Sequence, residues 1–112
     1  MLGDVSVRPD ATVARPHGDL DLVTVDALRE LLDGLCAGPA RTIILDLSDV
    51  TFMDVLSLSV VLGAADAMRE LGRRLVVENA SAAVRRLCEL LNAEDILEAS
   101  DSLPYIVIPP AC

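Results

Sequence analysis

Residues 43–47 form a nearly continuous run of aliphatic side chains, interrupted only by Asp46, and this run constrains the fold more than any other feature. Such short runs, rich in β-branched residues, are typical of strands that are covered on both faces, as in parallel sheets. We therefore expect residues 43–47 to form the central strand of a sheet. Helical patterns occur on both sides of the run, and strands that alternate with helices predict parallel pairs with right-handed crossovers.

Three segments carry apolar residues at the i, i+3, i+4, i+7 spacing of one helical face. The first is expected to run from an N-cap at Thr24 to about Cys36, where Gly38 and Pro39 stop it. The second starts at Asp54 and closes at Gly72, and the third starts at Ser81. The three expected faces consist of Leu28, Leu31, Leu32, Leu35 and Cys36; of Leu58, Val61, Leu62, Ala65 and Met68; and of Val84, Leu87, Cys88 and Leu91.

The remaining strands are short. Residues 5–7 and 12–14 predict a hairpin around Pro9 and Asp10, and residues 73–78 predict a further strand. Residues 48–53 are expected to form a loop. Residues 105–108 are flanked by prolines and are expected to form either an edge strand or part of a tail. The same two alternatives apply to the whole stretch 100–112. The chain is thus expected to be a single α/β domain over residues 1–112, a mixed β-sheet with parallel pairs covered by about three to four helices.

The charge of the chain excludes several classes of partner. The sequence has a formal net charge of -9 and contains nine arginines and no lysine. Such a chain repels phosphate backbones, so neither nucleic acid nor an anionic membrane is an expected partner. The apolar run 55–65 is too short to span a bilayer, and the first residues lack the pattern of a secretion signal. A cytoplasmic protein that binds another protein is expected.

No catalytic or metal-binding pattern is present in the sequence. Cys36, Cys88 and Cys112 lack the close pairing of zinc or redox motifs. His17 is the only histidine and has no nucleophile at a recognisable spacing. We therefore expect no cofactor, no metal and no enzymatic activity, and we interpret Cys36 and Cys88 as small buried hydrophobic residues.

Residues 43–54, followed by Leu58 and residues 60–64, resemble the signature segment of the STAS family, and in particular of the anti-sigma factor antagonists. In that family the segment is a buried strand, a loop with the pattern D-L/V-S/T-F-M-D-S-S-G-L, and a helix. Residues 18–21 resemble the "G-E-L-D" before the first helix, and residues 84–91 resemble the "V-x-R-x-L" helix. The resemblance extends from about residue 13 to about residue 96.

The resemblance implies a regulator that captures an anti-sigma factor of the serine-kinase type and so releases a sigma factor. It places the partner-binding surface at Asp19, Asp21, Asp54, Val55, Leu56 and Ser57. In the family the kinase phosphorylates the first serine after the aspartate, at the start of a helix. This sequence has Val55, Leu56 and Ser57 where the family has serine, serine and glycine. Valine has no hydroxyl group, so the usual switch is absent at that residue.

Three interpretations follow from Val55. The chain is a constitutively active antagonist, which we favour because valine matches the charge of the unphosphorylated state. Alternatively, Ser57 or Ser59 is a displaced acceptor, or Val55 and Leu56 form an apolar patch for a different signalling partner. The alternative function from another class is a STAS domain that senses a nucleotide or other small ligand. The oligomeric state stays open, with Val55, Leu56 and residues 106–108 as contact candidates.

Overall fold

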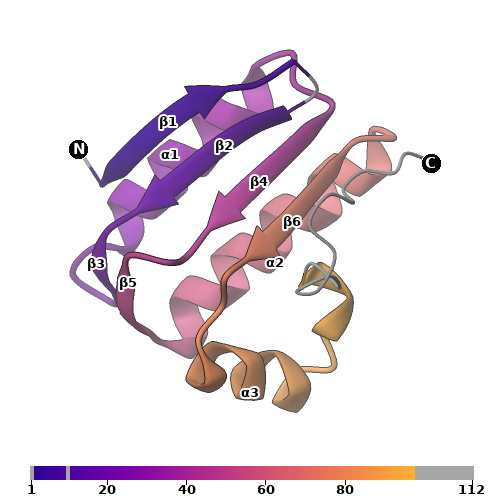
Figure 1. Cartoon of the computed structure of the whole chain (residues 1–112). Helices are drawn as coiled ribbons and strands as arrows, with labels where there is room; N and C mark the ends of the chain where they lie inside the picture. Colours follow the sequence, from indigo (N-terminus) through magenta and orange to yellow (C-terminus); the bar gives the residue numbers. More distant parts are fainter. Residues whose placement is uncertain (1, 10, 98–112) are drawn as a thin grey trace.

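The computed structural model describes residues 2–9 and 11–97. Its main sheet has the strand order β1-β2-β4-β6, formed by Gly3–Val7, Ala11–Pro16, Thr42–Asp46 and Arg74–Glu78. Helices α1 (Val25–Ala37) and α2 (Val55–Glu70) lie side by side behind this sheet, whereas α3 (Ala82–Leu90) lies at one end of it (Figure 1). A short 3-10 helix, η1 (Glu94–Ile96), follows α3. The predicted α/β fold with parallel pairs is confirmed.

The sheet is mixed. β1 and β2 form the predicted antiparallel hairpin, while β2 with β4 and β4 with β6 pair in parallel. β4 therefore lies inside the sheet, between β2 and β6, and all five of its residues are buried. This burial on both faces is the physical reason for its nearly continuous apolar sequence.

The hydrophobic core has two parts, one on each face of the sheet. The larger part lies under α1 and α2 and includes Leu28, Ile43, Leu45 and Met68. A smaller cluster on the opposite face is made of Ala11, Val13, Ile44 and Val76. Alternate residues of each strand thus enter different clusters, as the two-residue period of a strand requires.

The predicted starts of all three helices are confirmed, at the N-caps Thr24, Asp54 and Ser81. The side chain of Asp54 accepts a hydrogen bond from the Ser57 backbone N–H, and that of Ser81 accepts one from the Val84 N–H. The side chain of Thr24, the N-cap residue of α1, makes no capping hydrogen bond. The Thr24 hydroxyl instead donates to the backbone carbonyl of Asp19, at 2.9 Å, and so fixes the turn before the helix.

Other expectations need correction. The predicted loop 48–53 contains a strand, β5 (Val50–Met53), which pairs in parallel with β3 (Gly18–Leu20), a segment that the sequence pattern treats as a break. Leu91 lies beyond the end of α3 and is 39% exposed, because the helix ends one residue earlier. Cys88 is buried as expected, whereas Cys36 is only half-buried. Residues 105–108 and Cys112 lie outside the described residues.

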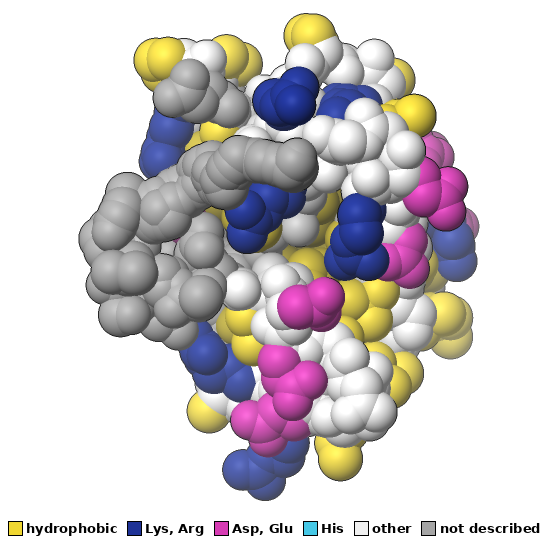
Figure 2. All heavy atoms as spheres, turned by 90° about the vertical axis from the view of Figure 1, so that its right-hand side faces the viewer, with side chains coloured by type: hydrophobic (Ala, Val, Ile, Leu, Met, Phe, Trp, Pro, Cys, Tyr) yellow, Lys and Arg dark blue, Asp and Glu magenta, His cyan; other side chains and the backbone are white. Residues whose placement is uncertain are grey.

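Charge is distributed unevenly over the chain. On the side of the molecule that faces the viewer in Figure 2, arginine and acidic side chains are interspersed, with hydrophobic atoms between them. The segments 17–28 and 47–58, by contrast, contain five aspartates and no arginine. Within residues 2–9 and 11–97, no helix is long and apolar enough to cross a membrane.

Candidate protein-docking site

The two short strands β3 and β5 bring distant parts of the sequence together. Leu20 pairs with Met53, and the backbone N–H of Asp54 donates to the Leu20 carbonyl at 3.0 Å. The residues that follow β3 therefore lie next to the first turn of α2. A hydrogen bond of 2.6 Å from the Thr51 hydroxyl to the Asp19 carboxylate joins the same two strands on their exposed side.

Five large apolar side chains are exposed around this strand pair. We call them the docking patch: Leu22 is 73% exposed, Val23 89%, Phe52 53%, Val55 48% and Leu56 41%. Leu22 and Val23 follow Leu20 at the same spacing at which Val55 and Leu56 follow its partner Met53. Exposed apolar residues that gather at one place, rather than singly, mark an interaction surface.

Aspartates accompany the docking patch. Asp19 is exposed, Asp21 and Asp54 are half-buried, and all three make hydrogen bonds that shape the site. The Asp21 carboxylate accepts a hydrogen bond from the Val23 N–H at 3.0 Å and so holds the turn that exposes Leu22 and Val23. The Asp54 carboxylate caps α2 at 2.8 Å. An apolar centre among carboxylates suits a partner surface that is apolar and basic.

The two serines that the sequence offers as displaced acceptors, Ser57 and Ser59, differ in accessibility. Ser57 is fully buried, and its hydroxyl oxygen has no hydrogen-bond partner within the described part of the chain. A kinase needs the hydroxyl within hydrogen-bond reach of its catalytic base, so this burial argues against Ser57 as an acceptor and against direct contact with a docked protein. Ser59 is exposed on α2.

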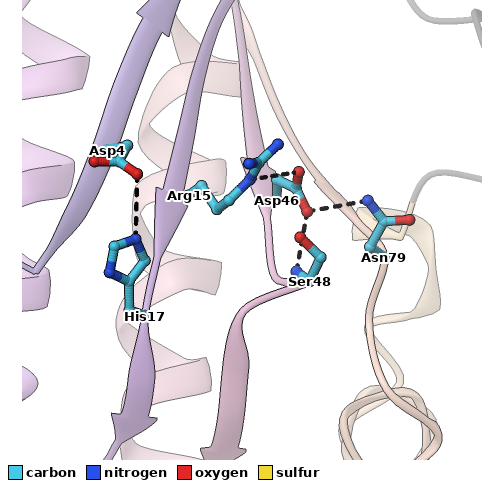
Figure 3. A network of polar contacts seen from close by, with 6 residues as sticks. All are labelled: Asp4, Arg15, His17, Asp46, Ser48 and Asn79. Atoms are coloured by element: carbon cyan, nitrogen blue, oxygen red, sulfur yellow. Dashed lines mark hydrogen bonds and ion pairs between the residues drawn. The ribbon is translucent and has the colours of Figure 1, made fainter.

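A polar network around Asp46 supports the connection that leads to the site (Figure 3). Asp46 ends β4 and is buried, and its carboxylate accepts hydrogen bonds from the Arg15 Nε at 3.1 Å, from the Asn79 Nδ2 at 3.0 Å and from the Ser48 backbone N–H at 3.0 Å. These bonds fix the start of the turn between β4 and β5. The position of β5, and thus of Asp54 and Val55, depends on that turn.

The network also sets the ionisation of Asp46. Burial by itself raises the pKa of this carboxyl group, but the hydrogen bonds from Asn79, Ser48 and Arg15 together outweigh burial, so the pKa is lowered. The pKa values of the thiols shift in the opposite direction, since burial raises the pKa of both Cys36 and Cys88. Both thiols therefore stay protonated at neutral pH, which is consistent with structural roles.

The lowered pKa of Asp46 predicts a pH dependence of stability. Because the folded-state pKa lies below the unfolded value of about 3.9, the carboxylate stabilises the fold above that pH, and the contribution is lost as the pH falls through the folded value. Urea titrations between about pH 6 and about pH 3 should show a smaller acid-induced loss of unfolding free energy for Asp46→Asn than for the parent chain. Asp66→Asn, at an exposed carboxylate, is the control. Equal losses for Asp46→Asn and the parent would contradict this assignment.

Comparison with known families agrees with the fold. The model of the STAS domain matches residues 4–104, so the chain belongs to the STAS family. Among its relatives, the anti-sigma-B factor antagonist of Listeria monocytogenes is 30% identical over 81 residues, which is 72% of this chain and 71% of that protein. The anti-sigma-B factor antagonist of Staphylococcus aureus is 27% identical over 84 residues, or 75% and 78% of the two chains.

Solved structures show the same fold. The unphosphorylated anti-sigma factor antagonist SpoIIAA aligns with a TM-score of 0.73 and 24% identity, over 85% of this chain and 84% of that one. An anti-sigma factor antagonist from Mycobacterium paratuberculosis aligns with a TM-score of 0.74 and 22% identity, over 86% and 81%. The resemblance deduced from residues 43–54 is therefore confirmed at the level of family and fold.

Sequence reasoning missed three members of the docking patch: Leu22, Val23 and Phe52. A signal was present for each. Leu22 and Val23 precede the first helix and do not belong to its apolar stripe. Helix packing therefore does not account for an apolar pair at these two residues. Phe52 alternates with the buried Met53 along β5, and it could be assigned to the exposed side only once the segment was known to be a strand.

Proposed function

We propose that this protein is an anti-sigma factor antagonist that binds a kinase-type anti-sigma factor through the docking patch, together with Asp19 and Asp54. The observation that carries the proposal is the exposure of Val55 and Leu56 at the first turn of α2, beside Leu22 and Val23. In the family that the sequence resembles, the kinase phosphorylates the first residue of this turn. The role is one of binding, and it needs no catalytic group.

We further propose that the antagonist is constitutively active. Val55 occupies the acceptor position and cannot carry a phosphate, and the next hydroxyl along the chain, that of Ser57, is buried. Val55 instead adds apolar area to the surface that a phosphate would disrupt by charge and bulk. Ser59 is exposed on α2 and stands as the alternative acceptor.

The test is native mass spectrometry of the full chain mixed with each kinase-type anti-sigma factor of its own genome, in the presence of Mg-ATP. A complex without added phosphate supports a constitutive antagonist. A complex followed by phosphate addition that Ser59→Ala abolishes would move the switch to Ser59. If no anti-sigma factor forms a complex, the antagonist role is wrong and the patch serves another partner.

Restoring the acceptor gives a direct prediction. Val55→Ser places a hydroxyl at the exposed first turn of α2, where serine is well tolerated and a phosphate is favoured by the helix dipole. We expect the variant to gain one phosphate from the cognate kinase and then to dissociate from that kinase, whereas the parent chain gains no phosphate. Val55→Ala, which removes the same methyl groups without adding a hydroxyl, is the matched control. A phosphorylated parent chain would contradict the prediction.

A groove between α1 and α2 favours a second candidate, the binding of a small ligand. The groove has a volume of about 310 Å³, and its lining includes Arg29, Asp33 and Cys36 from α1 and Gly63 from α2. It combines apolar walls with two charged groups, as ligand sites do. A saturable rise in melting temperature with a nucleotide, lost in Arg29→Ala, would support this function over the antagonist role.

A further inference from the structure

The outer edge of β1 is a second candidate interaction surface, distinct from the docking patch. β1 is the terminal strand of the main sheet, and among residues 2–9 and 11–97 no strand pairs with its outer side. Val5 lies opposite Ala14, a residue of the larger core cluster, so Val5 and Val7 point to the face of the sheet that α1 and α2 cover. Even so, Val5 is 46% and Val7 81% exposed. An edge of this kind is a template for pairing with another strand.

The hydrogen bonds of the hairpin define which backbone groups are free at this edge. Arg8 and Ala11 exchange two hydrogen bonds, of 2.7 and 3.4 Å, and the His17 N–H donates to the Leu2 carbonyl at 2.9 Å. Bonded and non-bonded pairs alternate along an antiparallel ladder, so Asp4 and Ser6 also bond toward β2. The N–H and C=O groups of Val5 and Val7 therefore point outward.

The sequence of β1 is complementary to itself. We propose that two copies of this chain associate by antiparallel pairing of their β1 strands, with Val5 opposite Val7 of the second copy. This register joins the outward backbone groups of Val5 and Val7 in both copies and gathers four valines on one face. It also sets Asp4 opposite Arg8 of the second copy, twice, on the other face.

Charge selects this register over its neighbours. With Val5 opposite Val5 of the second copy, Asp4 faces Ser6, and with Val7 opposite Val7, Arg8 faces Ser6. Only the register with Val5 opposite Val7 sets unlike charges directly across from each other, an arrangement that stabilises cross-strand pairs. The Asp4 carboxylate lies 3.3 Å from the His17 Nε2 of its own chain, but the Asp4 side chain is still 79% exposed and Arg8 is also exposed, so both are accessible to a second copy. Charged side chains on a natural edge strand usually prevent it from pairing with another strand, whereas the charges of β1 are complementary to those of a second β1.

The strand pairing uses no residue of the docking patch, since none of them belongs to β1. The valine pairs add apolar contacts because α1 leaves Val7 largely open. Two five-residue strands bury less surface than a standard stable interface, so the dimer should form in a concentration-dependent way. Each copy would then present its own docking patch to an anti-sigma factor.

The test is sedimentation of the full chain over a concentration series at low salt, with charge-reversed variants. Asp4→Arg alone puts arginine opposite arginine, and Arg8→Asp alone puts aspartate opposite aspartate. We expect each to weaken the dimer by on the order of tenfold. An equimolar mixture of the two variants should restore association, because each reversed charge then faces its complement. No other register predicts this rescue.

Two further variants separate the edge from the docking patch. Val5→Pro removes an outward N–H that the hairpin does not use, so it should abolish the dimer while the melting temperature stays near that of the parent. Leu56→Glu should leave the dimer intact while it weakens binding of the anti-sigma factor. A parent chain that is monomeric at every concentration, a Val5→Pro variant as dimeric as the parent, or a mixture without rescue would overturn the proposal.

Discussion

Replacing Val55 with glutamate should weaken binding of the anti-sigma factor by at least about 30-fold, the loss expected when a central apolar contact of an interface is removed. Val55 is the first residue of α2 and is a half-exposed member of the docking patch. A carboxylate there would have to lose its water against an apolar partner surface, which costs free energy unless the partner supplies a cation. Isothermal titration calorimetry of the complex measures the effect.

The fold of the Val55→Glu variant should be unaffected. A negative charge in the first turn of a helix interacts favourably with the helix dipole, and the Val55 side chain contributes little to the core. Leu90→Glu is the matched control, because it introduces the same charge at another exposed apolar residue, on α3 and outside the docking patch. If both variants bind as the parent does, the docking patch is not the binding surface. If both lose binding equally, net charge rather than the patch is responsible.

Replacing Arg73 with alanine should lower the free energy of unfolding by about 2–4 kcal/mol, the largest effect on stability that we expect from a single polar side chain of this protein. The Arg73 guanidinium donates four hydrogen bonds to three carbonyls at the end of α1: Cys36 at 2.7 Å, Gly38 at 2.8 Å, and Ala40 at 2.7 and 3.0 Å. It thereby ties the last turn of α1 and the following loop to the start of β6. Removal leaves these carbonyls without their donor.

Urea unfolding of two further variants distinguishes the hydrogen-bonding geometry from the charge. Arg73→Lys keeps the charge but not the planar fork, so it should recover only part of the loss. Arg69→Ala removes an exposed arginine that pairs with Asp66 and Asp95, and it should cost no more than about 1 kcal/mol. A lysine variant as stable as the parent would show that charge alone accounts for the role of Arg73.

Local signals were sufficient for much of the fold. The buried run of β4, the helical spacing of α2 and α3, and the caps Asp54 and Ser81 all depend on residues within a few positions of each other. Such features are visible in a sequence because burial and capping impose fixed residue types at fixed spacings. The replacement of the acceptor serine by Val55 was likewise evident from the sequence, since it needs only the neighbouring signature residues.

Only the tertiary structure decided the composition of the docking patch. β3 and β5 are three and four residues long, and they are strands because they pair with each other across a separation of 32 residues, as the bond between Asp19 and Thr51 shows. The burial of Ser57 and the contacts of Arg73 with the end of α1 depend in the same way on distant segments. The sequence by itself determined the family, the main elements and the missing hydroxyl at residue 55. Which apolar residues stand exposed beside Val55 was decided by the packing of the chain, because strand pairing between short segments has no periodic trace in the sequence.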